Sequence, residues 1–282
     1  MGQIINGREV AKVVKENIKA FVDERIKNNK SVPKIASILV GNDGGSIYYM
    51  NNQEKVATSL GLLFNKIILD ESVKEEELIK IIQDLNKDNT VSGIIMQLPL
   101  PKHINEKKVV NYICEDKDID CLTVKSQGKL YMSDKGFLPC TPNSVVTLLK
   151  SLNVDLSGKE AVVVGRSNIV GKPTAQLLLN ENCTVTICHS RTKHLKEVCK
   201  RADIIVAAIG KPKFIDDSFI KDGAIVIDVG TSSVDGKICG DVDFDKVIDK
   251  ACFVTPVPGG VGALTTTLLI KNACEALKNN ED

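Results

Sequence analysis

Apolar and polar residues follow two different periods along the first half of the chain. In residues 7–28, valine, isoleucine and phenylalanine recur every three or four positions, which predicts an amphipathic helix. Beyond it, continuously apolar runs predict strands at 34–41, 62–69 and 92–101, and helical patterns lie between them at 46–60 and 74–86. This β-α-β-α-β order with continuously apolar strands predicts a parallel sheet covered on both faces.

A second alternation begins at Glu160, after a segment in which Thr141 is expected to cap a helix that starts at Pro142. Its apolar strands are AVVVG, CTVTICHS, ADIIVAAIG, GAIVIDVG and CFVTPVPGG, with helices expected at 171–181, 193–200 and 262–279. The pattern predicts an α/β fold of two lobes with a cleft between them. We expect a first domain at 1–140, a dinucleotide-binding domain at 141–262, and a C-terminal helix, 263–282, that packs back on the first domain.

Composition narrows the class of protein. The chain has 282 residues and a net charge of +1, with no basic face for nucleic acid, no signal peptide and no apolar run long enough to span a membrane. Its nine cysteines contain no CxxC pair, so we expect reduced, mostly buried thiols and a cytoplasmic protein. Cys188, His189 and His194 do not form an established ligand set, and no metal is expected.

The stretch AVVVGRSNIVGKP (161–173) runs from a buried strand through a glycine-bearing turn into a helix, where backbone N–H groups can hold phosphate. Gly165 and Gly171 remain from a dinucleotide fingerprint, and Ser167 stands where its second glycine would be. About 20 residues later the next strand ends in Ser190 and Arg191 rather than an acid. A hydroxyl and a cation suit a 2′-phosphate, so NADP is favoured over NAD, with Arg166 also within reach.

Two further stretches lack an ordinary structural explanation. TPVPGGVG (255–262) combines prolines with Gly259 and Gly260, which predicts a shaped loop that lets backbone approach a flat ligand. In SIYYMNNQEK (46–55), Tyr49 and Gln53 are four residues apart and share one helix face. An amide does not titrate near neutral pH, so this polar pair offers no base.

Six motifs in order, VGRSNIVGKP, CTVTICHSRT, DVGTSSVDGKICGDVDF, TPVPGGVG, GIIMQLPLP and PCTP, resemble the methylenetetrahydrofolate dehydrogenase/cyclohydrolase family over nearly the whole chain. The resemblance implies an N-terminal catalytic lobe, a Rossmann-like NADP lobe and a homodimer in one-carbon metabolism that supplies purine biosynthesis. It implies oxidation of 5,10-methylenetetrahydrofolate to the methenyl form, followed in most members by hydrolysis to 10-formyltetrahydrofolate.

The resemblance also implies site residues. The folate site would contain Tyr49, Gln53, Gln97 and Asp120. The cofactor site would contain Gly165, Arg166, Ser167, Gly171, Ser190, Arg191 and Thr231, and the loop lining the cleft Pro258, Gly259 and Gly260.

The chain departs from the family where a lysine is expected four residues after the tyrosine, because Gln53 stands there. Lys55 would point away, roughly 200° around the helix. Hydride transfer chiefly requires alignment of the two carbons, whereas hydrolysis gains from a titratable group. We therefore expect a dehydrogenase with weak or absent cyclohydrolase activity. The alternatives are a fully bifunctional enzyme, a non-catalytic NADP- or folate-binding regulator, and a dehydrogenase of another small substrate.

Overall fold

The computed structural model describes residues 2–234 and 236–281, which form two compact units. The N-terminal unit comprises residues from Val13 to Leu138 and the chain from Thr266 onward. The C-terminal unit comprises the chain up to Lys12 and residues from Pro139 to Thr265. No helix within the described residues is long and apolar enough to cross a membrane.

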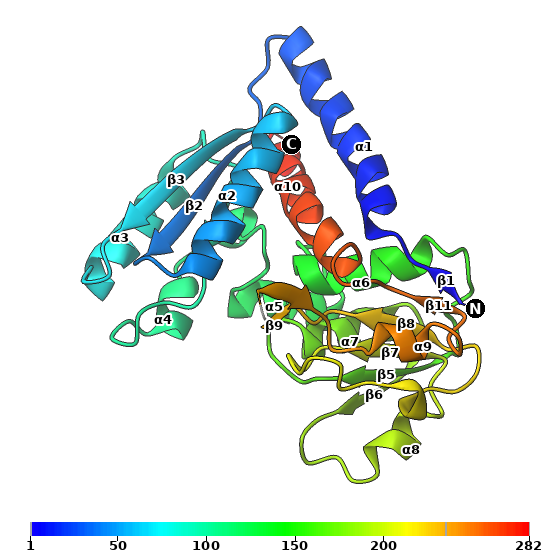
Figure 1. Ribbon diagram of the computed structural model, residues 1–282. Coiled ribbons are helices and arrows are strands. Elements are labelled where there is room, and N and C mark those ends of the chain that lie inside the picture. The colour runs from blue at the N-terminus through cyan, green and yellow to red at the C-terminus, as the bar shows by residue number, and fades with distance from the viewer. Residues whose placement is uncertain (1, 235, 282) are drawn as a thin grey trace. The chain divides into compact units, whose positions relative to one another are not determined.

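The N-terminal unit is built on a three-stranded parallel sheet in the order β3-β2-β4 (Figure 1). Its strands are β2 (Lys34–Val40), β3 (Leu63–Leu69) and β4 (Gly93–Met96). Its helical segments are α1 (Gly7–Lys27) from residue 13, α2 (Gly44–Ser59), α3 (Glu75–Lys87), α4 (Glu106–Val110), η1 (Glu115–Lys117), α5 (Val124–Met132) and α10 (Val261–Asn279) from residue 266.

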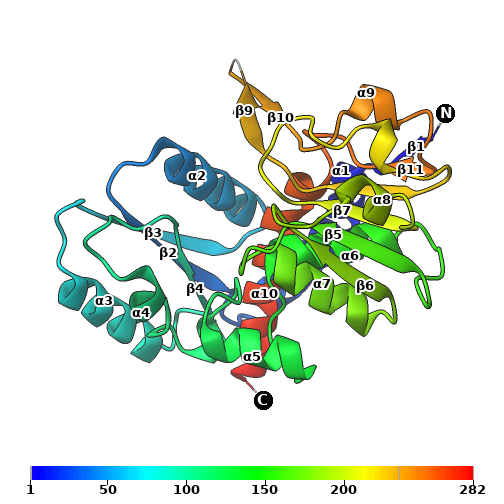
Figure 2. The same ribbon diagram turned by 90° about the horizontal axis from the view of Figure 1, so that it is seen from below.

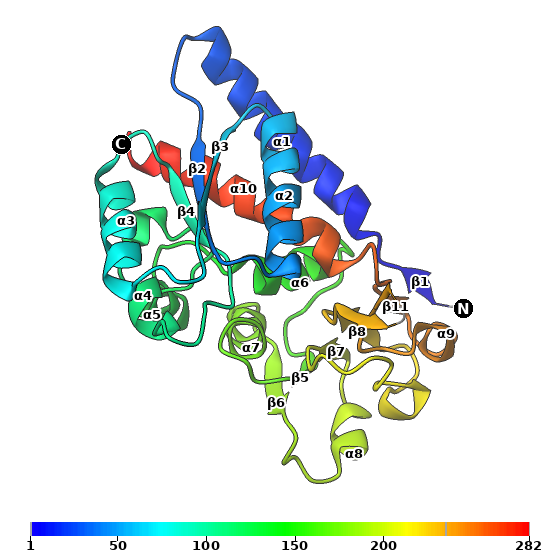
Figure 3. The same cartoon turned by 60° about the vertical axis from the view of Figure 1, so that its left-hand side comes forward.

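Helices cover the two faces of this sheet differently. Helices α3 and α4 lie on one side of the strands and α2 lies on the other (Figure 3). The α3 side buries an apolar cluster that includes Ala36, Ile38 and Val40 from β2. Since alternate residues of a strand face opposite sides, Ile35, Ser37 and Leu39 face α2.

The C-terminal unit contains a six-stranded sheet in the order β1-β11-β8-β7-β5-β6, and every pairing in it is parallel. Its strands are β1 (Gln3–Ile4), β5 (Glu160–Val164), β6 (Thr184–Cys188), β7 (Ile204–Ala207), β8 (Ile225–Asp228) and β11 (Phe253–Val254). The helical segments are α6 (Cys140–Lys150), α7 (Gly171–Asn180), α8 (Leu195–Cys199), η2 (Asp217–Phe219) and α9 (Phe244–Val247).

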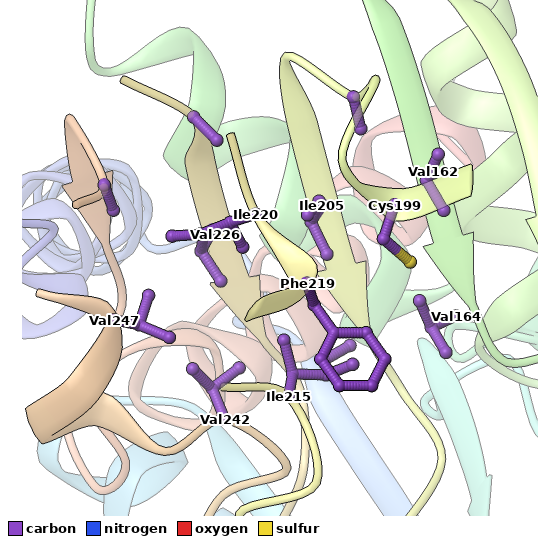
Figure 4. Close-up of a cluster of buried hydrophobic side chains, with 14 of the residues drawn as sticks. Val162, Val164, Cys199, Ile205, Ile215, Phe219, Ile220, Val226, Val242 and Val247 are labelled. Atoms are coloured by element: carbon purple, nitrogen blue, oxygen red, sulfur yellow. The ribbon is translucent and has the colours of Figure 1, made fainter. Parts of the chain in front are cut away.

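Apolar side chains from β5, β7 and β8 form the core of this unit with residues from the loops that follow them. Figure 4 shows Ile205 and Val226 on neighbouring strands, with Ile215 and Phe219 packed over them. An antiparallel hairpin, β9 (Ser232–Val234) with β10 (Lys237–Cys239), extends away from the sheet (Figure 2).

The predicted α/β class with parallel sheets is confirmed, but several local expectations were wrong. Thr141 does not cap α6, because the helix already begins at Cys140 and its N-cap position is Pro139. Strand β4 ends at Met96, since the prolines of LPLP lack the N–H that a ladder needs. Strand β3 is not covered on both faces: it lies at the sheet edge, where Leu63 and Ile68 are exposed.

The beginning of the chain pairs far from its sequence neighbours. Strand β1 joins β11, so the residues up to Lys12 group with the C-terminal unit rather than with the remainder of the expected 1–140 domain. The end of α10 ties into the N-terminal unit, where Asn272 Nδ2 donates to the backbone oxygens of Ile119 at 2.8 Å and Leu138 at 3.2 Å. Six of the nine cysteines are buried, in line with the expectation that most would be.

Candidate functional site

The turn after β5 passes close to the loop after β7. Gly165 has φ of +139°, and a Cβ on it would lie 2.1 Å from the backbone oxygen of Ala208. Gly171 is equally restricted, because its Cβ would lie 2.4 Å from the oxygen of Gly165. A side chain at Gly165 would force the two loops apart, and one at Gly171 would push against the turn itself. Strand order reverses between β5 and β7, which is where open parallel sheets bind nucleotides.

Ser167 shapes this turn from within. Its Oγ accepts hydrogen bonds from the backbone N–H groups of Val170 and Gly171, both at 3.2 Å. Its backbone oxygen accepts from the N–H of Lys172 at 3.1 Å. The serine that occupies the second glycine position of the fingerprint therefore caps the start of α7.

Three exposed polar residues follow the ends of β5 and β6. Val164 pairs with Cys188, and the N–H of Gly165 donates to the oxygen of Cys188 at 2.9 Å. This register brings exposed Arg166 beside the turn that carries exposed Ser190 and Arg191. Two guanidinium groups and a hydroxyl thus follow the carboxyl ends of two neighbouring strands, one of which leads into the glycine turn.

Two buried aspartates, absent from our predicted site, hold the loops around this turn. Asp241 accepts from the backbone N–H groups of Ile209 at 2.7 Å, Gly210 at 3.0 Å and Lys211 at 2.7 Å. These residues continue the loop that Gly165 abuts. Asp228 accepts from the N–H groups of Gly230, Asp241 and Val242, each at 2.9 Å.

Burial raises the pKa of Asp228 to about 6, against the lowering effect of its three backbone hydrogen bonds. Glycines make room for this pair, because a Cβ on Gly240 would lie 1.9 Å from Asp228 Oδ2. The signal was present in DVG and CGDVD, where each acid adjoins a glycine within two residues. Thr231, expected at the cofactor site, is exposed directly after this buried segment.

The Pro-Gly-Gly loop approaches the beginning of the chain. The N–H of Gly7 donates to the oxygen of Gly259 at 3.0 Å, and a Cβ on Gly7 would lie 2.1 Å from the oxygen of Gly260. Gly259 has φ of +114°, Gly260 is buried and Pro258 is exposed. The close backbone approach in this structure is thus to the protein's own chain.

In the N-terminal unit the structure joins two of the predicted folate-site residues. Gln97, directly after β4, is 6% exposed and its Nε2 donates to Gln53 Oε1 at 2.7 Å. The same nitrogen donates to Ser37 Oγ at 2.9 Å. Gln53 belongs to the side of α2 that carries buried Met50 and Ala57, whereas Lys55 is exposed.

The other two predicted folate-site residues differ in exposure. Tyr49 is 49% exposed, and its ring meets that of Tyr48 edge-on with centroids 6.0 Å apart. Asp120 is half-buried. Its neighbour Asp118 is fully buried and accepts from the N–H groups of Leu122 and Thr123, both at 2.9 Å, so Asp118 orders this turn.

The strand order, the switch-point glycine turn and the cationic edge define a Rossmann-like dinucleotide-binding protein with a second α/β unit. Comparison with known proteins agrees. Residues 5–120 match the tetrahydrofolate dehydrogenase/cyclohydrolase catalytic domain, and residues 139–281 match the NAD(P)-binding domain of the same family. The chain therefore belongs to the tetrahydrofolate dehydrogenase/cyclohydrolase family.

Individual relatives match over almost their full lengths. The chain is 73% identical to the "Bifunctional protein FolD" of Clostridium botulinum (strain Alaska E43 / Type E3), covering 100% of both chains. The bifunctional FolD structure from Campylobacter jejuni has a TM-score of 0.96 at 38% identity, with 99% of each chain covered. The Trypanosoma brucei enzyme, solved with NADP cofactor and an inhibitor, has a TM-score of 0.94 at 35% identity, covering 99% of this chain and 98% of that one.

Proposed function

We propose that this chain oxidises 5,10-methylenetetrahydrofolate to the 5,10-methenyl form with NADP, as part of one-carbon metabolism. The observation that carries the proposal is the β5–β6 register, in which the glycine turn bearing Arg166 begins beside the strand end that leads to Ser190 and Arg191. Family membership supplies the folate substrate class, and the Trypanosoma brucei relative was solved with NADP.

The residues present fit NADP. Gly165 and Gly171 add no side chain at the two ends of the turn at the switch point, where a pyrophosphate would lie against backbone. Arg166 and Arg191 would pair with the 2′-phosphate, and Ser190 would hydrogen-bond to it. When bound, the cofactor supplies a carbon that accepts hydride. Thr231 and the Pro258–Gly260 loop would complete the surface that orients it.

In the N-terminal unit, the proposed site residues bind and orient rather than transfer protons. Asp120 would accept hydrogen bonds from the amino and ring N–H groups of the pterin. Tyr49 would position the folate ring, and Gln97 would hydrogen-bond within the same pocket. Hydride transfer requires chiefly this alignment and the exclusion of water.

Two proposals differ in whether the chain also hydrolyses the methenyl product. Relatives named as bifunctional match the whole chain, so the fully bifunctional enzyme has the better support. The opposing proposal, weak or absent hydrolysis, is supported by Gln53 alone, in the position where the resemblance puts a lysine. The Gln53 side chain makes a neutral hydrogen bond with Gln97 and cannot exchange a proton near pH 7.

A coupled spectrophotometric assay tests both activities. The protein is mixed with 5,10-methylenetetrahydrofolate and NADP, and NADPH and methenyl absorbance are followed separately. NADPH formation is the expected result, and its absence would refute the dehydrogenase proposal. Authentic methenyltetrahydrofolate is the second substrate. Decay of this compound above the buffer rate supports the bifunctional enzyme. Decay at the buffer rate supports a dehydrogenase with weak or absent cyclohydrolase activity.

The assembly is a separate proposal. Family resemblance supports a cytoplasmic homodimer, which sedimentation equilibrium of the purified chain would test. A mass of about twice the 30.6 kDa of one chain is expected, and the monomer mass would refute it.

A further inference from the structure

A hydroxyl is buried in the middle of the central strand of the N-terminal sheet. Ser37 is 0% exposed within β2, where the residues on both sides, Ala36 and Ile38, are also fully buried. Burial of a hydroxyl costs free energy unless it is hydrogen-bonded. A serine also has poor strand propensity compared with the valine or isoleucine that such a position favours. Ser37 therefore calls for an explanation that packing does not give.

The partner of Ser37 is a predicted folate-site residue. Ser37 pairs across the ladder with Ile95 of β4, and Gln97 lies two residues further along, so its side chain falls on the same face of the sheet. Gln97 Nε2 donates to Ser37 Oγ at 2.9 Å. The strand thus places a hydroxyl directly under the amide of Gln97.

The second hydrogen bond of that amide reaches α2. Gln97 Nε2 also donates to Gln53 Oε1 at 2.7 Å. A glutamine amide carries two N–H donors and one carbonyl acceptor. Both donors of Gln97 are therefore used within the protein, one by the strand below and one by the helix beside it. The carbonyl oxygen Oε1 is then the atom of this amide that can accept a contact from a ligand.

We propose that Ser37 is a positioning residue which, together with Gln53, fixes Gln97 with its carbonyl oxygen toward the reacting carbon of the folate. This inference rests on the proposed dehydrogenase function. When hydride leaves the methylene carbon with both bonding electrons, the positive charge that remains spreads over the two adjacent nitrogens. A fixed carbonyl dipole stabilises that charge as it develops, whereas an amide NH₂ group in the same place would oppose it.

The arrangement favours hydride transfer specifically. Fixed dipoles act without reorganisation at the moment of reaction, so they lower the barrier more than they tighten substrate binding. Loss of the Ser37 hydroxyl would leave the Gln97 amide held by Gln53 alone and allow it more rotation. We therefore expect kcat of the dehydrogenase reaction to fall while KM for the folate stays almost unchanged.

Two isosteric substitutions separate the hydroxyl from the packing. Ser37→Thr and Ser37→Val add nearly the same volume to the strand, and only threonine keeps the hydroxyl. We expect Ser37→Val to lower kcat about 5- to 10-fold relative to Ser37→Thr, with KM for the folate within about 2-fold. The primary isotope effect with substrate deuterated at the methylene carbon should rise in Ser37→Val, because hydride transfer becomes more rate-limiting.

The experiments separate a failure of the Ser37 role from a failure of the proposed dehydrogenase function. Equal kcat values and isotope effects in Ser37→Thr and Ser37→Val, with an active wild type, would overturn the role of Ser37 alone. A wild type without NADPH formation would overturn the proposed function and this inference with it. If thermal unfolding shows that the larger side chains do not fit, Ser37→Ala against wild type gives the same comparison without added volume.

The direction of the Gln97 carbonyl has its own test. Gln97→Glu keeps an oxygen at the proposed contact, and Gln97→Met keeps the length of the side chain without any polar contact. We expect Gln97→Glu to retain at least about 10-fold more hydride transfer than Gln97→Met. Equal rates in the two variants would show that no acceptor at this position assists the reaction.

Discussion

The side-chain amide of Gln97 donates a hydrogen bond to the side-chain oxygen of Gln53 at 2.7 Å, which joins the end of β4 to α2. Both partners are neutral. The pair therefore fixes geometry at the proposed folate site but offers no group that takes or gives a proton near neutral pH. This relationship makes position 53 the most informative place to test which reactions the protein performs.

Gln53→Lys should raise hydrolysis of methenyltetrahydrofolate by roughly 10- to 100-fold, because a positioned titratable group assists the attack of water. The gain should be larger at alkaline than at acid pH, since only the neutral amine accepts a proton. The decay of methenyl absorbance measures it. Gln53→Met, which removes the amide without adding a titratable group, is the control. A lysine variant no faster than the methionine variant would rule out a one-residue explanation.

Arg166→Gln should raise KM for NADP by about 10-fold or more, because a charge-assisted hydrogen bond to the 2′-phosphate would be lost. KM for NAD, which lacks that phosphate, should change little. Initial rates with each cofactor measure the difference. Lys200→Gln removes an exposed positive charge from the residue after α8 and serves as the matched control. An equal effect of Arg166→Gln on both cofactors would place the arginine away from the 2′-phosphate.

Asp241→Ala should lower the free energy of unfolding by about 2–4 kcal/mol, since three backbone N–H groups lose the buried carboxylate that accepts their hydrogen bonds. KM for the cofactor should also rise, because the freed loop abuts the Gly165 turn. Urea unfolding and initial rates measure the two effects. Asp245→Ala, at an exposed position of α9, should change neither. Normal cofactor binding in a destabilised Asp241→Ala variant would show that the loop held by Asp241 does not contribute to cofactor binding.

The pKa of Asp228, raised by burial to about 6, predicts a pH dependence with a definite sign. The folded state binds this proton more tightly than the unfolded chain, so the stability that Asp228 contributes is larger below its folded pKa and falls as pH rises through it. Between roughly pH 5 and pH 7.5 the change is about 1.4 kcal/mol.

The comparison that isolates this effect is the difference in unfolding free energy between wild type and Asp228→Asn at each pH. Asparagine does not titrate, so the advantage of the wild type should shrink as pH rises. The carboxylates whose pKa is lowered by hydrogen bonds, such as Asp203 beside Lys221, change stability in the opposite direction in both proteins and cancel. A difference that does not vary with pH would mean that Asp228 does not titrate in this range.

Several features of the fold were predictable because they are local. The apolar runs that became β2 and β5 and the periodic segment that became α1 follow from the spacing of side chains alone. The glycine turn after β5 was recognisable because residues other than glycine rarely adopt a positive φ such as that of Gly165. Shorter elements were missed: the hairpin β9–β10 has three residues in each strand, and α5 covers only Val124–Met132.

Long-range partners were not predictable in the same way. Nothing near Gln3 and Ile4 indicates that they extend a sheet whose neighbouring strand begins at Phe253. Likewise Asp228 and Asp241 are ordinary acids in the sequence until folding buries both and turns six backbone N–H groups toward them. Pairing over such separations depends on the whole chain, and the glycines beside the two acids do not identify the groups that they pair with.

The sequence by itself determined the α/β class, the parallel strands, the nucleotide-type turn and the family, since each depends on residue type at fixed spacing. Only the tertiary structure decided that Ser37 and Gln53 share the amide of Gln97, and that the turn after β5 begins beside the end of β6. The physical reason is that hydrogen bonds act over about 3 Å in space, whatever the distance along the chain. Strand register and helix rotation, set by burial of the core, decide which polar groups come within that range.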